Sequence, residues 1–325
     1  MSRLDIDVLD GSALEHAGAL LAREQAAARR TCPRLPESHT DARVCTEALQ
    51  QLLDAGGLGV VARVRGRPVA VMTAIARNAG SVGRYARLPA EGLAVDPDLD
   101  DPTTVLAPMY AQLAAPLVAD GVRRFYLLHV ARPRLPEGLS DIGFGRHGVY
   151  GVQAVAQRPA CREIGIRIAG PSDLDTVAGL ALVELRHRAT PPMFGPDDNR
   201  PQAEVLAEHR ALHEAGAVHL LATLDGREVG LLTIEPASAA PRICPAGQPY
   251  IGPTATHPDA RRRGVGRALV DAALNWAHRR GHRWLSVDFE AANPQSRPFW
   301  LAAGFHPTGY GLLRFVDPLH ATPGR

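Results

Sequence analysis

The chain contains no lysine: all 36 of its basic residues are arginine, set against 34 acidic residues. The formal net charge of +2 gives no support for a strongly basic surface of the kind that binds nucleic acid. Long apolar runs are missing too, since no stretch approaches the ~20 residues of a membrane-spanning helix. The four cysteines stand far apart, without the spacing of a metal or redox site. We therefore expect a soluble protein with reduced thiols, no metal, and no nucleic-acid or membrane partner.

The first residues, MSRLDIDVLDG, are acidic and alternate between apolar and polar side chains. This pattern predicts a first strand rather than a signal peptide, because a signal peptide begins with basic residues and continues into an apolar run. The expected location is cytoplasmic.

What the chain does have is a short segment, HPDARRRGVGRAL at 257–269, that predicts an anion-binding loop at the start of a helix. Backbone N–H groups there lack intrahelical partners, and the helix dipole adds roughly half a positive charge, which suits a phosphate. Glycines at 264 and 266 leave these amides accessible. Two known phosphate loops are excluded: no Lys-Ser or Lys-Thr follows Gly266 as in a Walker A loop, and Leu269 stands where a dinucleotide loop has its third glycine.

The remaining pattern, an arginine, two residues, a glycine, one residue and a glycine, resembles the acyl-coenzyme A (CoA) loop of the GNAT superfamily of N-acetyltransferases. Downstream, LSVDFEAANPQSRPFWLAAGF resembles the next block of that family, with an asparagine after a buried strand and a Gly-Phe pair at the family's spacing. Upstream, HLLATLDGREVGLLTI predicts a hairpin that turns at Asp225-Gly226. The resemblance covers about residues 164–318.

The hairpin also reveals an internal repeat. VVARVRGRPVAVMT at 60–73 mirrors LLATLDGREVGLLT at 220–233, an offset of 160 residues. We therefore predict two tandem GNAT-like domains, residues 1–157 and 158–325, each an α/β fold with a mixed, mostly antiparallel sheet flanked by helices. A tandem pair with one intact and one degraded copy is similar in architecture to the mycothiol synthase family, although no local motif points to that substrate.

The first copy lacks the anion-binding loop. Where the second copy reads DARRRGVGRAL, the first reads DLDDPTTVLAP, without glycine or arginine and with acids at Asp98, Asp100 and Asp101. Carboxylates repel a diphosphate, and Pro102 removes an amide donor. Arg132 stands where the second copy has its asparagine. We predict that the first domain does not bind CoA.

In the second copy, the resemblance implies a site for acetyl-CoA as co-substrate. A backbone N–H of a splayed strand, at Ala255 or Thr256, would stabilise the negative charge that develops on the thioester oxygen. Asn293 would hold the coenzyme or an ordered water, and it also has the features of a helix N-cap, with Pro294 at the first helical position. The expected CoA-binding residues are Ala255, Thr256, Arg261, Arg262, Arg263, Gly264, Val265, Gly266, Arg267, Asn293 and Phe299.

The proton-transfer groups of the family are not all present. Many members place a tyrosine seven residues after the asparagine, where this chain has Trp300. Tyr310, in the closing strand, is a candidate replacement for protonating the departing thiolate. The general base that removes the proton of the amine is left open among Glu235, Glu290 and His257.

The expected function is transfer of an acetyl group from acetyl-CoA to a primary amine of a small molecule or amino-acid-like acceptor, by direct attack on the thioester. The alternative is a CoA-binding sensor or self-resistance protein without turnover, which the tryptophan at the tyrosine position favours. His187 and Glu184, on the helix before an irregular, proline-rich loop, are expected to contact the acceptor. The sequence leaves the acceptor open and predicts a monomer or homodimer.

The degraded loop of the first copy gives a first test. In a crystal soaked with acetyl-CoA, we expect electron density for the coenzyme beside residues 261–267 and none beside residues 96–106, because the acids there repel a diphosphate. Coenzyme density against residues 96–106 would overturn the prediction that the first domain is a scaffold.

Overall fold

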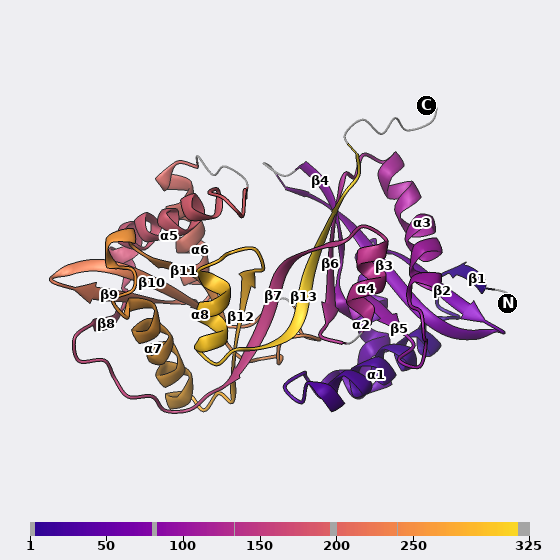
Figure 1. Cartoon of the computed structure of the whole chain (residues 1–325), viewed down its shortest axis with the longest axis horizontal. Helices are drawn as coiled ribbons and strands as arrows, with labels where there is room; N and C mark the ends of the chain where they lie inside the picture. The colour runs from indigo at the N-terminus through magenta and orange to yellow at the C-terminus, as the bar shows by residue number, and fades with distance from the viewer. Residues whose placement is uncertain (1–3, 80–82, 133, 196–199, 239, 318–325) are drawn as a thin grey trace. The chain divides into compact units, whose positions relative to one another are not determined.

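Helices and strands alternate in both halves of the chain, which the computed structural model describes over residues 4–79, 83–132, 134–195, 200–238 and 240–317 (Figure 1). Pro133 and part of the proline-rich loop, residues 196–199, lie outside the described residues. Two compact units divide the chain. Each is described by itself.

Unit 1 comprises residues 1–149, 240–243 and 307–325. Its strands follow the order β1-β2-β3-β4-β6-β13, with β5 also paired to β3; β4 and β6 are parallel, and the other pairs between these strands are antiparallel. The elements are β1 (Leu4–Val8), α1 (Leu14–Thr31), α2 (Ala42–Asp54), β2 (Leu58–Val64), β3 (Arg67–Ala79), β4 (Gly83–Leu88), β5 (Leu93–Val95), α3 (Thr103–Ala119), β6 (Arg124–Val130), α4 (Leu135–Asp141), the first half of β7 (Gly145–Ala154) and most of β13 (His306–Phe315), with short 3-10 turns η1 (Ser38–Thr40) and η2 (Ala90–Gly92).

Unit 2 comprises residues 150–239 and 244–306. Its strands follow the order β7-β12-β11-β10-β9-β8, in which β11 and β12 are parallel and β8 to β11 are antiparallel. The elements are the second half of β7, β8 (Gly165–Ile168), α5 (Leu174–Arg188), α6 (Gln202–Glu214), β9 (Val218–Leu224), β10 (Arg227–Glu235), β11 (Tyr250–Thr256), α7 (Val265–Arg279), β12 (Trp284–Glu290) and α8 (Ser296–Ala302), with 3-10 turns η3 (Pro171–Asp173) and η4 (Pro258–Ala260).

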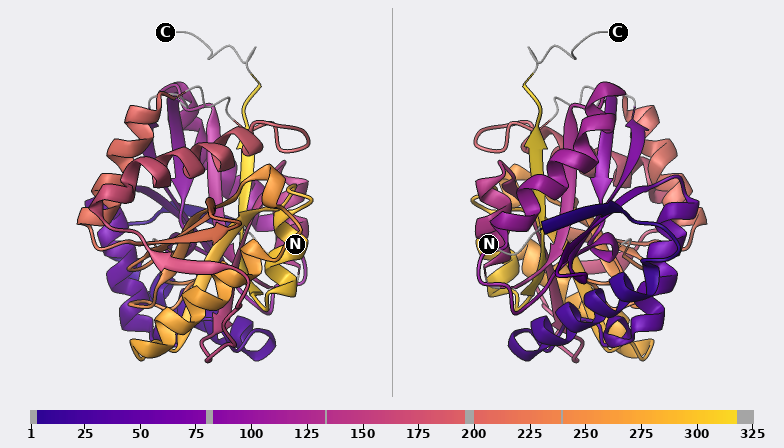
Figure 2. Two further views of the ribbon diagram at one scale, coloured as in Figure 1. Left: turned by 90° about the vertical axis from the view of Figure 1, so that its left-hand side faces the viewer. Right: turned by 90° about the vertical axis from the view of Figure 1, so that its right-hand side faces the viewer.

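The two-residue period of the strands sorts their side chains between two helical layers. In unit 1, Val61 and Val71 pack with α1 and α2, whereas Val60 and Met72 pack with α3 and α4. In unit 2, Leu221 and Leu231 pack with α5 and α6, and α7 covers the opposite face of β9 and β10. Figure 2 shows α5–α6 and α7 on opposite sides of the unit 2 strands (left) and α1 and α3 on opposite sides of the unit 1 strands (right). The expected fold class is confirmed.

The closing strands differ from the expected division at residue 157. β13 follows the helices of the second half along the chain, yet from Pro307 onward it belongs to unit 1 and pairs antiparallel with β6. β7 belongs to unit 1 up to Val149 and to unit 2 from Tyr150. The alternating pattern of residues 306–315 predicts a strand, but it carries no information about which neighbour that strand pairs with.

The repeated hairpins have the turn geometry that their sequences predict. Arg65 and Gly66 have φ angles of 52° and 77°, and Asp225 and Gly226 have φ angles of 51° and 73°. Two successive positive φ values are the mark of the type I′ turn, which matches the twist of two-residue hairpins. The prediction of a hairpin at Asp225-Gly226 is confirmed, and the first copy repeats it.

The described residues contain neither a candidate membrane span nor a candidate metal cluster. None of their helices combines the length and apolar character of a membrane span. None of their His, Cys, Asp and Glu side chains form a group of three or more that could hold a metal ion. The cysteines Cys32, Cys45, Cys161 and Cys244 are free thiols.

Three buried histidines, His39, His129 and His219, are expected to make the fold sensitive to acid. Burial lowers the pKa of each from 6.5 to about 4. Between about pH 6.5 and 4, these histidines are protonated in the unfolded chain but neutral in the folded chain. The free energy of unfolding therefore falls as the pH drops from about 6.5 towards 4. Urea denaturation should show a falling free energy of unfolding across this window, by up to about 3 kcal/mol per histidine.

A His129→Phe variant, in which one of these groups no longer titrates, should lose stability less steeply over the same window. Equal slopes for the variant and the parent chain would contradict this account of the acid sensitivity.

Candidate functional site

In unit 2, β11 parts from β12 after two paired residues. The parallel register joins Tyr250 to Ser286 and Ile251 to Val287 and, among the described residues, goes no further. Residues 252–256 thus keep β10 as a strand neighbour on one side only. A strand edge of this kind offers a row of backbone donors and acceptors to an extended ligand.

Thr256, rather than Ala255, presents its amide to this open edge. His257 N–H donates to Val229 O at 2.8 Å, so these residues form a hydrogen-bonded pair of the antiparallel ladder. Bonded and non-bonded pairs alternate, and Ala255 opposite Leu231 is therefore bonded to β10 as well. The N–H and C=O of Thr256, which lies between them, point away from β10. The strand register selects one of the two residues that the sequence left open.

The loop that follows β11 exposes a run of amides. Arg262 has a φ angle of 61° and Gly264 one of 87°, so the backbone turns twice through the left-handed region before α7 begins. The first intrahelical bond runs from Ala268 N–H to Gly264 O at 2.9 Å. The amides of residues 265–267 therefore have no acceptor within the helix, and this is the geometry of an anion-binding site.

Acidic neighbours orient two of the four arginines of this loop. Arg263 lies 2.9 Å from Asp225 in the β9–β10 turn, and Arg267 lies 2.9 Å from Asp271 one turn along α7. Arg262 is exposed, and within the described part of the chain it makes no ion pair. The loop therefore keeps a net positive charge at the end of the open edge.

Phe299 of α8 packs directly on the loop. A Cβ atom at Gly266 would lie 3.2 Å from its ring, so the glycine is needed for this close approach. The Phe299 ring meets Trp300 edge to face at 5.0 Å, and Trp300 in turn meets Phe305 at 5.4 Å. Trp300 is only 5% exposed. The residue at the position of the family tyrosine is thus a core side chain.

Asn293 is buried and forms an Asx turn ahead of α8. Its Oδ1 accepts hydrogen bonds from the amides of Gln295 at 3.0 Å and Ser296 at 2.9 Å. The helix begins at Ser296 with Gln295 as its N-cap, so the expectation of Asn293 as N-cap and Pro294 as the first helical residue is off by two positions. Asn293 still satisfies amides of the first turn, as a cap would.

His187, at the end of α5, lies beside the same asparagine. Burial lowers the pKa of its imidazole, and the Arg261 guanidinium lowers it further, whereas Glu290 and a hydrogen bond with Asn293 act in the opposite direction. Its Nε2 is buried and, among the described residues, has no hydrogen-bond partner. The structure therefore brings the end of α5 next to the loop that follows β11.

A second polar group lies on three adjacent strands of the sheet. Glu235 on β10 is opposite Tyr250 on β11, and the Tyr250 hydroxyl donates to Asp288 on β12. Burial raises the pKa of the Glu235 carboxyl, and the charges of Asp288 and Glu208 raise it further. A Cβ atom at Gly252 would collide with the Glu235 carboxylate, so this glycine makes the room that Glu235 occupies.

Glu290, at the end of β12, is held by an arginine that the sequence analysis missed. Arg188 Nε lies 2.9 Å from Glu290 Oε1 and 3.7 Å from Glu184 Oε1. The second Glu290 oxygen, Oε2, is buried without a hydrogen-bond partner in the described structure. The four-residue spacing of Glu184 and Arg188 on one helix indicates an ion pair between these two residues. Nothing in the sequence pattern indicates the contact of Arg188 with Glu290.

The two remaining candidates for proton transfer are Tyr310 and His257. Tyr310 belongs to unit 1, where it is opposite His129 on β6 and the Arg146 guanidinium lies 4.3 Å from its ring centroid. His257 is a loop residue whose Nδ1 lies 3.5 Å from Asp259. Within unit 2, Phe299 and Thr256 lie beside Gly266 of the loop, and His187 lies near Arg261, Glu290 and Asn293. Glu235 forms a separate group with Tyr250 and Asp288, at the other end of β11 from Thr256.

Comparison with known proteins agrees with this geometry. Residues 181–305 match the model of the acetyltransferase (GNAT) family. Two curated proteins are similar over parts of the chain: a mycothiol acetyltransferase from Mycolicibacterium vanbaalenii, 33% identical over 94 residues, and a type 1 aminoglycoside N(6')-acetyltransferase from Klebsiella aerogenes, 50% identical over 48 residues. The matched stretches cover 29% and 15% of this chain and 29% and 32% of those proteins, less than a third of the length of each relative.

Solved structures resemble the whole chain. A GCN5-related N-acetyltransferase from Sphaerobacter thermophilus superposes with a TM-score of 0.60 at 17% identity, covering 98% of both chains. A tandem GNAT protein from the clavulanic acid biosynthesis pathway superposes with a TM-score of 0.54 at 16% identity, covering 98% of this chain and all of the other. These likenesses concern the fold. The match to the acetyltransferase (GNAT) family model concerns residues 181–305, in the second half of the chain.

Proposed function

We propose that unit 2 transfers the acetyl group of acetyl-CoA to a primary amine of a small molecule. The observation that carries the proposal is the open edge of β11 together with the amides at the start of α7, which lack an acceptor within the helix; the end of that edge, Thr256, lies beside Gly266. An extended arm ending in a diphosphate fits such a surface, because the strand edge pairs with amides of the arm and the helix start binds the phosphates.

The residues of the loop would divide the binding of the coenzyme between them. Amides 265–267 would bind diphosphate oxygens, Arg261 to Arg263 and Arg267 would add attraction for the anion, and Phe299 would close one side. The Thr256 N–H faces the open edge and would stabilise the oxyanion of the tetrahedral intermediate, which carries more negative charge than the thioester it comes from.

Glu235 is the proposed general base. An amine attacks only after it has lost its proton, and a carboxylate with a raised pKa accepts that proton more readily than an ordinary one. Burial and the neighbouring acids give Glu235 this property. Glu290 is a weaker candidate because its Oε1 accepts a charged hydrogen bond from Arg188. His187 is a further group beside Asn293 that could exchange protons with the site.

At the position where many members of the family have a tyrosine to protonate the departing thiolate, unit 2 has Trp300. Trp300 is buried among Phe299 and Phe305, and an indole N–H is not a useful acid. A CoA thiol ionises much as cysteine does, with a pKa of about 8.5, so it leaves adequately without an acid. We propose that solvent protonates the thiolate.

The acceptor is proposed to be a cationic amine. Glu235, Asp288 and Glu290 place three carboxylates on adjacent strands or their ends, where their negative charges would attract a cation. Two relatives are named for acetylation of mycothiol and of an aminoglycoside, and an aminoglycoside is a cation of the expected type. A CoA-binding protein without turnover remains the second candidate, favoured by Trp300 alone.

Calorimetry with acetyl-CoA tests the binding site. We expect one site per chain and its loss in a Gly266→Glu variant, because the new carboxylate would repel the diphosphate and crowd the Phe299 ring. Gly179→Glu is the matched control: it adds the same charge on α5, where a side chain meets nothing within 4 Å, and should bind normally. At a hundredfold excess over Kd, binding should stabilise the parent chain by about 2.7 kcal/mol. Absence of heat and of any thermal shift in the parent chain would refute the proposal.

The pH dependence of thiol release with a panel of amines tests Glu235. The rate should fall as the pH drops through the raised pKa of the Glu235 carboxyl. Glu235→Gln should lower kcat/KM by about 100-fold or more. The variant should also lose the fall in rate at acidic pH, while its affinity for acetyl-CoA stays unchanged. A carboxyl whose pKa is raised by folding costs stability as the pH rises through that pKa, so the variant should be no less stable at pH 7. Glu204→Gln, an exposed charge change on α6, serves as the control. Coenzyme binding without amine-dependent thiol release would favour the second candidate.

A further inference from the structure

Unit 1 repeats the strand geometry of the coenzyme site. Asp96 N–H donates to Val69 O at 2.7 Å, as His257 donates to Val229 in unit 2. The alternation along the ladder therefore points the backbone groups of Leu93 and Val95 away from β3, just as those of Thr256 point away from β10. Unit 1 has the same row of backbone groups that the second copy offers to a ligand.

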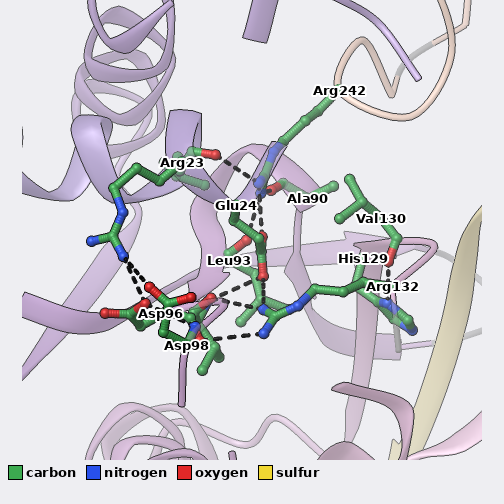
Figure 3. Close-up of polar contacts among 12 residues, drawn as sticks. Arg23, Glu24, Ala90, Leu93, Asp96, Asp98, His129, Val130, Arg132 and Arg242 are labelled. Carbon is green, nitrogen blue, oxygen red and sulfur yellow. Dashed lines mark hydrogen bonds and ion pairs between the residues drawn. The ribbon is translucent and has the colours of Figure 1, made fainter. Parts of the chain in front are cut away.

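In unit 1, side chains of the protein already occupy these groups (Figure 3). Val95 N–H donates to Glu24 Oε1 at 3.2 Å, and Val95 O accepts from Arg132 at 2.7 Å. Leu93 O and Ala90 O each accept from Arg242 Nη1 at 2.6 Å. No backbone partner remains along this stretch for a pantetheine arm.

The three side chains form one buried ionic group. Glu24 Oε1 lies 2.6 Å from Arg132 and its Oε2 lies 2.8 Å from Arg242. Their side chains are 1%, 7% and 1% exposed for Glu24, Arg132 and Arg242. Every charged partner is thus paired and removed from water, and Arg242 donates in addition to Leu21 O at 3.1 Å.

The three residues have different origins in the sequence. Glu24 lies 160 residues before Glu184 and Arg132 lies 161 before Asn293, so both stand at repeat positions. Arg242 comes from the loop between β10 and β11. Residues 240–243 belong to unit 1, although both strands that they connect belong to unit 2.

The backbone at Arg242 is fixed as firmly as its side chain. Arg242 N–H donates to Glu91 Oε1 at 3.0 Å, and its carbonyl accepts from Gln25 Nε2 at 3.2 Å. Seven residues before it, β10 ends at Glu235, and eight residues after it, β11 begins at Tyr250. Arg242 is therefore a fixed point within the connection between β10 and β11.

We propose that Arg132 and Arg242, joined by Glu24, permanently fill the groove of unit 1 that corresponds to the coenzyme site. We propose further that Arg242 is a positioning residue: by anchoring the β10–β11 loop it holds Glu235 in place. Both statements rest on the function proposed for unit 2, the first through the coenzyme site and the second through Glu235.

Arg242→Lys tests the anchor. One ammonium group cannot reach the three carbonyls and the carboxylate that the guanidinium fork joins, so amide hydrogen exchange should speed up in peptides covering 236–249 and remain unchanged in α7. We expect kcat to fall at least about 10-fold, because misplacing a catalytic group by about 1 Å costs on the order of 100-fold. The acid limb assigned to Glu235 should shift, and the Kd for acetyl-CoA should stay within about twofold because the contacts of the 261–267 loop are untouched.

The matched control is Arg23→Lys, which replaces the guanidinium of a partially exposed arginine paired with Asp96. Arg23 is not one of the three residues that fill the groove, so the amide hydrogen exchange of residues 236–249 and the kcat should match those of the parent chain. Should Arg242→Lys fail to fold, Glu91→Ala loosens the same segment without leaving a buried charge and should give smaller changes in the same direction. Unchanged exchange at 236–249 would overturn the anchor, as would faster exchange with an unaltered kcat and pH profile.

Acetyl-CoA binding to a Gly266→Glu variant tests whether the groove of unit 1 is filled. In this variant the site of unit 2 is blocked, so acetyl-CoA binding in unit 1 would contradict the proposal that the groove is filled. If the parent chain shows no binding and no thiol release, the function proposed for unit 2 fails by itself. The exchange measurement still decides whether Arg242 anchors the loop.

Discussion

A strand that parts from its neighbour leaves backbone N–H and C=O groups that need partners, and both units of this protein contain such a strand. Buried backbone groups without partners cost about as much as a lost hydrogen bond each, so the open edge must be satisfied by water, by a ligand or by side chains. In unit 2 the edge of β11 leads into the exposed amides of residues 265–267. In unit 1 the matching edge is closed by Arg132, Arg242 and Glu24.

The loss of the anion-binding loop and the filling of the groove in unit 1 are consistent with one another. Without the glycines and arginines of the second copy, no cradle for a diphosphate is left, and Asp98 lies beside Asp96 in a network with Arg23. An unfilled groove would then have exposed polar backbone without providing a ligand site. Guanidinium groups suit the task of filling it, because each presents several donors in a fixed fork and is more weakly hydrated than an ammonium.

Local features of the site could be predicted from the sequence, whereas long-range pairing could not. The Asp225-Gly226 turn and the glycine at 264 follow from backbone sterics that act within a few residues. Thr256 could be distinguished from Ala255 only once the pairing of β11 with β10 was known. The place of Tyr310 in unit 1 depends on which strand accepts β13 as a neighbour, and the alternation of residues along a strand is the same for either choice. The partners of Arg242 lie about 150 to 220 residues away along the chain.

The ionic group in unit 1 also resists reversal. Two guanidinium groups and one carboxylate leave one positive charge in excess, which the carbonyl dipoles of Leu21, Ala90 and Leu93 stabilise. Removing Glu24 leaves two buried guanidinium groups without a carboxylate, a change that costs on the order of 3–5 kcal/mol. Removing either arginine leaves buried backbone carbonyls without their donor, which costs about 1–3 kcal/mol for each group. Such losses are a large part of the roughly 5–15 kcal/mol by which a domain is usually stable. Reopening the groove to a coenzyme would therefore require at least two substitutions together, while each one alone weakens the fold. The charged network that pairs with the backbone groups of unit 1 thus maintains the difference between the two units: the strand edge is filled in unit 1 and open in unit 2.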